Sequence, residues 1–173
     1  MLNNQILSTT TVDLFGYGIG INTLSIAAAD NAGNQSKLSV DFEIIANISS
    51  TAADTETIYE RGWITKKVDK ELLIRQLKYL KWKLEHLDKK TEKLEKLIKK
   101  IEDNQKISPK KKQKTIRHLN KKIERVIEYK QRTIERELNL LERILNKIKR
   151  KNKINQEGYV IIIGDINYLR ENL

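Results

Sequence analysis

The residues of this chain with the most evident chemistry are lysine and arginine. The 173 residues include 34 Lys and Arg against 23 Asp and Glu, for a net charge of +11. Clustered cations bind phosphates and acidic polymers without needing a precise fold. We predict polyanion contact at two clusters: Lys110, Lys111, Lys112, Lys114 and Arg117, and Lys147, Lys149, Arg150, Lys151 and Lys153.

Three interpretations of these clusters stay open. Glu and Lys alternate at i,i+4 spacing, so the first is a plain solvated face that stabilises a long helix. The second is contact with an anionic cell-envelope polymer, such as a wall polymer, an acidic glycan or a lipid surface. Specific nucleic-acid binding is the least favoured, because no aromatic residue interleaves the lysine clusters to stack on bases.

Two loops in the first third of the chain have residue types found in ligand sites but lack the rest of the required pattern. The glycines at 16, 18 and 20 imitate a nucleotide-binding loop, but no Lys-Ser/Thr follows and the next element is a strand. The loop with Asp30 and Asn34 offers few of the oxygens that calcium requires. We interpret both as plain loops.

The remaining candidate residues also favour structural roles. Asp165 ends an apolar run like the first strand of several phosphatases, but only eight residues follow it and none is a histidine. His86 and His118 lack a third ligand for zinc. Trp63 and Trp82 could form a carbohydrate platform, although core or flank packing is the favoured interpretation. We predict no catalytic, metal or cofactor residues.

Charge divides the chain into two parts. Residues 1–60 contain one basic residue and seven acidic ones, whereas residues 61–173 carry a net charge of +17. Cysteine is absent, and no signal peptide or apolar run long enough to cross a bilayer is visible. The split predicts two units with different surroundings.

The first unit, residues 1–47, is predicted to be a β segment. Residues 23–28 and 38–44 alternate apolar and polar side chains, as half-buried strands do. The residues between them, Asp30 to Asn34, suit a hairpin turn. A weaker strand is expected at Thr11–Phe15. So few strands leave one apolar face to be covered by the helices, a second chain or further strands.

Residues 20–26 and the run Ala29-Asp30-Asn31-Ala32-Gly33-Asn34 resemble the last hairpin of bacterial immunoglobulin-like repeats. The resemblance covers about residues 11–45. It implies a cell-surface or secreted protein, of which this chain would be a C-terminal fragment or a remnant that keeps only the end of a repeat, because the earlier strands are lacking.

The second unit is predicted to be helical. A short helix over residues 50–62, capped by Ser50 or Asp54, lies in a linker over 48–68. Residues 69–173 follow as a helical hairpin, about 69–104 and 109–151, and a C-terminal helix, about 156–171. Apolar residues spaced alternately by four and three predict an antiparallel seam. That seam comprises Leu73, Leu77, Leu80, Leu84, Leu87, Leu94, Ile98 and Ile101, then Ile116, Leu119, Ile123, Val126 or Ile127, Ile134, Leu138, Leu141, Leu145 and Ile148.

Two details of the helical unit are less regular. Thr91 interrupts the first seam, and Lys130 and Gln131 interrupt the second, so we expect these interruptions to face each other. The run 159–163 would suit a strand or a helix. We favour a helix that packs across one end of the hairpin.

The helical unit also resembles the FIMAH module, an α-helical domain near the C-terminus of many bacterial extracellular proteins. The matching positions are Gly62, Trp63, Ile64, Leu72, Leu77, Leu84, Ile154, Glu157, Ile162 and Tyr168. The resemblance spans residues 54–170, with a hairpin about thirty residues longer than in the family. It implies an extracellular location and assigns no catalytic residue.

Taken together, the sequence predicts an α+β, mostly α fold and a non-catalytic structural or adhesive module of a cell-surface or secreted protein. Its helical rod would act as a spacer or an anchor in that protein, and its basic surface would contact an anionic envelope polymer or glycan. The alternative is an intracellular coiled-coil protein that self-associates or binds nucleic acid. A homodimer is left open by the interrupted seam and the uncovered β face.

Overall fold

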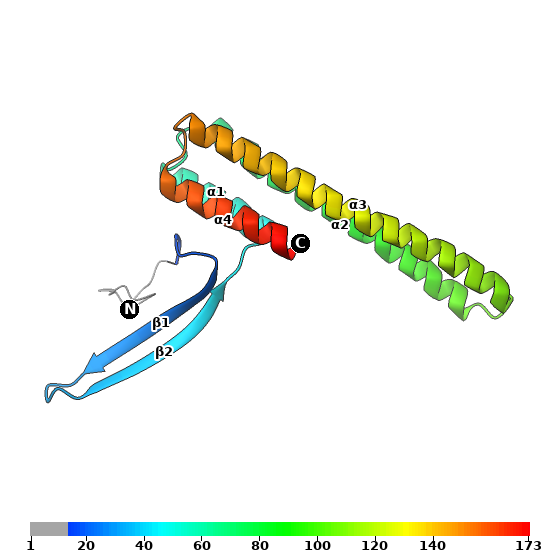
Figure 1. Ribbon diagram of the computed structural model, residues 1–173, viewed down its shortest axis with the longest axis horizontal. Helices are drawn as coiled ribbons and strands as arrows, with labels where there is room; N and C mark the ends of the chain where they lie inside the picture. Colours follow the sequence, from blue (N-terminus) through cyan, green and yellow to red (C-terminus); the bar gives the residue numbers. More distant parts are fainter. Residues whose placement is uncertain (1–13) are drawn as a thin grey trace.

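The computed structural model describes residues 14–173, in which a β hairpin precedes four helices (Figure 1). The fold is α+β and mostly α, as predicted. Of the weak strand expected at Thr11–Phe15, residues 11–13 lie outside the described residues. Leu14 and Phe15 are not in a strand but begin a turn before the hairpin, in which the Tyr17 N–H donates to the Leu14 carbonyl at 3.1 Å.

The hairpin consists of strands β1 (Gly20–Ala29) and β2 (Gln35–Ile44), paired antiparallel. Leu24 is opposite Val40 and Ile26 is opposite Leu38, so the expected apolar face is present. On the other face the Thr23 hydroxyl donates to Asp41, at 2.8 Å. The outer part of the apolar face is uncovered, with Ile26 57% and Leu38 63% exposed.

Helices α2 (Lys67–Asp103) and α3 (Pro109–Arg150) form the long antiparallel hairpin. Proline at the first position of α3 fits its missing N–H and its fixed φ. Ser108 occupies the N-cap of α3, but its hydroxyl makes no capping hydrogen bond. With 42 residues, α3 is about 60 Å long.

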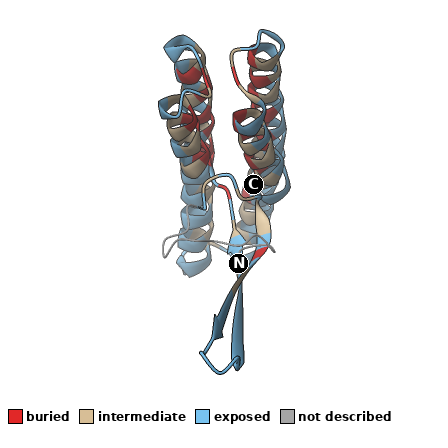
Figure 2. Cartoon of the chain, turned by 90° about the vertical axis from the view of Figure 1, so that its left-hand side faces the viewer, coloured by how far each residue is buried: buried red, intermediate tan, exposed pale blue. Residues whose placement is uncertain are grey.

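Helices α1 (Ile48–Glu60) and α4 (Gln156–Asn172) pack on one end of this hairpin and form with it a four-helix arrangement, which we call the base (Figures 1 and 2). The cap of α1 is neither Ser50 nor Asp54. Asn47 accepts from the N–H groups of Ser49 and Ser50, and the Ser50 hydroxyl accepts from the Asn47 N–H. The first backbone N–H groups of a helix have no partner within the helix, and this capping box satisfies some of them. It explains why α1 begins at Ile48 and not at residue 50 as predicted.

The core lies in the base, where the seam meets α1 and α4. Its fully buried side chains are Ile58, Ile64, Leu73, Leu77, Leu80, Leu138, Leu141, Leu145, Ile162, Ile166 and Leu169. A short bridge between Ile64 and Ile154 ties the α1–α2 connection to the α3–α4 connection. The Asn155 N–H donates to the Trp63 carbonyl there, at 3.0 Å.

Residues 159–163 are helical, as favoured. However, α4 lies lengthwise and antiparallel along α3 rather than across its end, since Tyr159 contacts Asn146 and Arg170 contacts Glu142. Lengthwise packing lets α4 bury Ile162, Ile166 and Leu169 together, because these positions share one helical face.

Beyond the base, α2 and α3 continue as a two-helix rod. Leu94, Ile98 and Ile116 keep the seam there but are only half-buried, because no further helix covers them. Val126, not Ile127, belongs to the seam. None of the described helices has the length and apolar character needed to cross a membrane.

The side chains at the two seam interruptions have partners of their own. The Lys130 ammonium lies 2.6 Å from the Asp88 carboxylate, and the Thr91 hydroxyl donates to the Leu87 carbonyl of its own helix. These contacts do not test whether the two interruptions face each other, which stays a prediction.

Candidate functional site

The two predicted lysine clusters lie at opposite ends of α3. Residues 110–117 occupy its first turns and residues 147–153 its last turn and the connection to α4. From residue 112 to residue 149 the helix rises about 55 Å. The structure therefore does not join them into one surface.

The cluster at the base, Lys147 to Lys153, is partly used by the fold. The Lys153 ammonium lies 3.2 Å from the Asp69 carboxylate, with both side chains mostly covered. The Lys149 ammonium lies 5.5 Å from the centre of the Tyr159 ring, within cation–π range. Lys147, Arg150 and Lys151 remain exposed.

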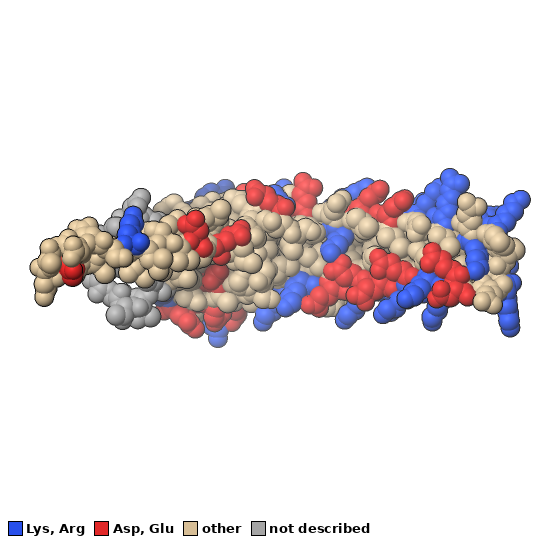
Figure 3. Space-filling model, turned by 90° about the horizontal axis from the view of Figure 1, so that it is seen from below, with Lys and Arg blue, Asp and Glu red and all other residues tan. Residues whose placement is uncertain are grey.

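The other cluster belongs to a larger positive surface on residues 89–125, which we call the distal rod. These residues include 15 Lys and Arg against five Asp and Glu, so they carry +10 of the net charge of +11. Basic side chains gather there, at the end opposite the β hairpin (Figure 3). Lys110, Lys111, Lys114 and Arg117 are exposed, and Lys112 donates to the Glu102 carbonyl at 2.6 Å.

A groove between α2 and α3 lies where the distal rod begins, and we call it the aromatic groove. It has a volume of about 700 Å³. Apolar side chains and seven aromatic or cationic ones line it: Leu87, Leu94 and Val126, with Trp82, Lys83, His86, Lys90, Lys122, Arg125 and Tyr129.

The aromatic side chains of α2 form a row beside this groove. The rings of Tyr79 and Trp82 have centres 6.0 Å apart and are tilted by 31°, while those of Trp82 and His86 are also 6.0 Å apart and stacked, with 26° between their planes. Trp82 is 59% exposed and Tyr129, on α3, is 47% exposed. Positions 79, 82 and 86 share one face because three- and four-residue steps complete a helical turn.

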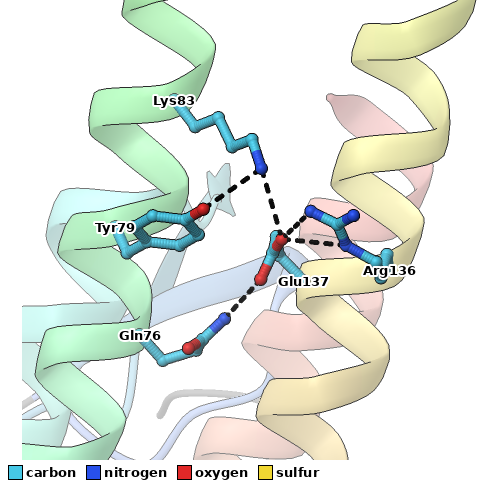
Figure 4. Close-up of polar contacts among 5 residues, drawn as sticks. All are labelled: Gln76, Tyr79, Lys83, Arg136 and Glu137. Carbon is cyan, nitrogen blue, oxygen red and sulfur yellow. Dashed lines mark hydrogen bonds and ion pairs between the residues drawn. The ribbon is translucent and has the colours of Figure 1, made fainter.

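At its inner end, the groove borders a buried carboxylate (Figure 4). Glu137 of α3 is 5% exposed and accepts from Gln76 of α2 at 2.8 Å and from Arg136 Nε at 3.0 Å. The Lys83 ammonium lies 3.8 Å from the same carboxylate and donates to the Tyr79 hydroxyl at 3.1 Å. A buried charge requires such partners, so these contacts fix Lys83 in place.

This network also fixes the protonation of its cations. The hydrogen bond to Tyr79 is the main cause that raises the pKa of Lys83. The hydrogen bond to Glu137, followed by its charge, raises the pKa of Arg136. Both side chains therefore remain cationic beside the groove at neutral pH.

A second buried acidic site lies in the base, between α1 and α4. Asp165 is 3% exposed, and its Oδ2 atom has no hydrogen-bond partner. Burial, followed by the charge of Asp54, raises the pKa of Asp165 to about 8, and burial also raises that of Asp54. Both residues line a cavity of about 210 Å³, of which residues 14–19 form another wall. One shared proton relieves the repulsion between such a pair.

The loops that resembled ligand sites are occupied by their own hydrogen bonds. Asp30 accepts from the N–H groups of Ala32 and Asn34 and from the Asn34 side chain, and this last bond is the main cause that lowers the pKa of Asp30. The Asn22 amide donates to the carbonyls of Gly18 and Gly20 in the glycine loop.

The two tryptophans have different environments. Trp63 packs in the base, 5.9 Å from Phe15 and beside Arg61, whereas Trp82 stands exposed at the aromatic groove. His86 lines the groove but His118 does not. In the described range, 14–173, no three His, Cys, Asp or Glu side chains are grouped so that they could hold a metal ion.

Sequence reasoning missed the aromatic groove, the contacts of Glu137 and the pairing of Asp54 with Asp165. The spacing of Tyr79, Trp82 and His86 signals an aromatic face on one helix. Tyr129 and Arg125 join it only through the register between the helices, for which the sequence gives no direct signal. The predicted lysine clusters contain no aromatic residue, but the cations that meet aromatic rings in the groove, Lys90, Lys122 and Arg125, lie outside those clusters.

Comparisons with known proteins identify no homologue of this chain. Neither protein-family models, nor curated protein sequences, nor solved structures give a match to this chain. The function is therefore argued from the groove, the distal rod and the two resemblances in the sequence.

Proposed function

We propose that this chain is a non-catalytic module of a cell-surface or secreted protein, and that its distal rod holds an anionic polymer. The observation that carries the proposal is the concentration of charge, because 15 of the 34 basic residues lie in the 37 residues 89–125. Only five acidic residues accompany them there, so acidic side chains of the rod can pair one to one with at most five of the fifteen cations.

The length of the rod supports this role. Helices α2 and α3 extend beyond α1 and α4, so the positive end stands clear of the base (Figure 1). A linear polyanion can then lie along both helices and release its counterions, which requires no enclosed pocket. The base anchors the rod, and the resemblances to immunoglobulin-like repeats and the FIMAH module support a location outside the cell.

The proposal is tested with polyphosphate, a linear polyanion without rings, at low and moderate salt. The double variant Lys110→Glu/Lys111→Glu is compared with Lys147→Glu/Lys151→Glu, which changes the net charge equally but at the base. We expect the distal variant to lower affinity about tenfold or more, as loss of several phosphate contacts does, and the base variant to change it little.

Two results would contradict the proposal. One is the absence of polyphosphate binding by the unaltered chain at low salt. The other is an equal loss in both double variants, which would mean that binding follows net charge rather than the distal rod. Circular dichroism checks that both variants keep their helices.

A homodimer remains a prediction. The uncovered apolar face of the β hairpin, with Ile26, Leu38 and Val40 exposed, is the surface that would take part, because a hairpin alone is marginally stable in water.

A further inference from the structure

The aromatic groove differs from the rest of the distal rod in its chemistry. Lysines scattered over a helix attract any polyanion, but the groove combines exposed rings, an apolar floor and cations in one concave surface. Single exposed apolar residues are common on proteins. Here Tyr79, Trp82 and Tyr129 are all more than 40% exposed, close together and from two helices. Such a surface suits a ligand with a flat apolar face and negative groups at its edge.

The cations of this region indicate which kind of anion fits. The distal rod contains 13 lysines and only two arginines, Arg117 and Arg125. Arginine recognises carboxylates, phosphates and base edges alike through paired hydrogen bonds, whereas lysine acts as a point charge. A surface dominated by lysine therefore suits single charges spaced along a chain, and the exposed rings of Trp82 and Tyr129 favour a chain of sugar rings over a phosphate chain without rings.

We propose that the aromatic groove binds an acidic polysaccharide, with the apolar face of a sugar ring against Trp82 and its carboxylate near Lys90, Lys122 and Arg125. This inference rests on the proposed function and names the polymer class. All four residues line the groove, Trp82 and Lys90 from α2 and the other two from α3.

The charges around the groove indicate in which direction the bound polymer extends from it. Lys90, Lys122 and Arg125 belong both to the groove and to the distal rod, so positive charge continues outward from the groove. At the inner end, Glu137 engages Lys83 and Arg136. The repeating carboxylates of the polymer are thus attracted towards the turn at residues 104–108 and not towards the base.

The test compares two linear polyanions on the full chain: oligogalacturonate, a chain of uronic-acid rings, and polyphosphate of matched charge, without rings. The key variant is Trp82→Ala, and the matched control is Val68→Ala, which also changes an exposed apolar side chain of α2 but lies outside both the groove and the distal rod. Titration calorimetry at a fixed salt concentration gives the affinity of the unaltered chain and of each variant for each polymer.

We expect Trp82→Ala to weaken oligogalacturonate binding about tenfold, the size of a lost stacking contact. Polyphosphate binding should change less than about twofold, since no ring is stacked. Trp82→Phe should restore part of the affinity, and Val68→Ala should affect neither polymer. Because Trp82 is largely exposed, its removal should leave the helical content unchanged.

The outcomes that overturn the inference are distinct from those that overturn the proposed function. If polyphosphate binds but Trp82→Ala leaves oligogalacturonate binding unchanged, the groove inference fails and the polyanion function stands. If neither polymer binds, the proposed function fails as well. A third titration uses a thymidine oligonucleotide. A larger loss on that ligand than on oligogalacturonate would identify single-stranded nucleic acid as the occupant and reject the polysaccharide.

Discussion

The base and the distal rod are made from the same two helices and the same seam, yet they are different environments. In the base, α1 and α4 cover the hairpin, and Leu77 and Leu138 are almost completely buried. In the distal rod only the facing helix covers the seam, so Leu94 and Ile98 remain half-buried. Burial of apolar area provides the main favourable term in folding. The base therefore supplies stability, which leaves the distal rod free to carry unbalanced charge.

The largest expected effect is the loss of stability when a core side chain of the base is shortened. Leu138→Ala should lower the free energy of unfolding by about 2–5 kcal/mol, because it removes a fully buried side chain and leaves a cavity. Leu97→Ala, on the distal rod and 47% exposed, should cost less than about 1 kcal/mol. Urea unfolding of both variants checks the difference, and equal losses would mean that the two regions are equally packed.

The next effect concerns the acidic pair of the base. In the folded chain the pKa of Asp165 is raised to about 8, so the folded state holds a proton that the unfolded state releases near pH 4. Stability is therefore lost as pH rises from about 4 through 8. Asp165→Asn, which keeps a hydrogen-bond donor towards Asp54, should raise the stability at pH 9 by about 3 kcal/mol relative to the parent.

Urea unfolding at pH 5 and pH 9 measures this linkage. The variant should lose less stability than the parent between these two values. Asp88→Asn, at an exposed carboxylate on α2, is the control and should leave the pH dependence as it is. A parent chain that is equally stable at both pH values would contradict the shared proton.

The smallest effect distinguishes two glycines of α4. A Cβ atom at Gly158 would lie 2.8 Å from the Ile58 side chain of α1, whereas one at Gly164 would meet nothing within 4 Å. Gly158→Ala should therefore destabilise the base by about 1–3 kcal/mol through overpacking. Gly164→Ala should stabilise it by about 0.5–1 kcal/mol, because alanine is the better helix former. Thermal unfolding compares the two, and the same sign for both would contradict the close approach of α1 and α4.

The sequence by itself determined the elements of this protein. Alternating residues define the hairpin strands, and the four-and-three spacing defines the long helices and their buried faces. Proline at 109 and glycine at 62 mark where helices begin or end. These signals are local, because each depends on residues a few positions apart in one element. The positive charge of residues 89–125 can likewise be counted without a structure.

Only the tertiary structure decided which residues of different elements meet. Tyr129 and Arg125 join Trp82 in one groove, Glu137 meets Gln76 and Lys83, and Asp165 meets Asp54. The same applies to the lengthwise placement of α4 and to the separation of the two lysine clusters. Each depends on helix register and on which side of the hairpin α1 and α4 cover. Packing of whole faces sets those choices, and no spacing within a single helix encodes them.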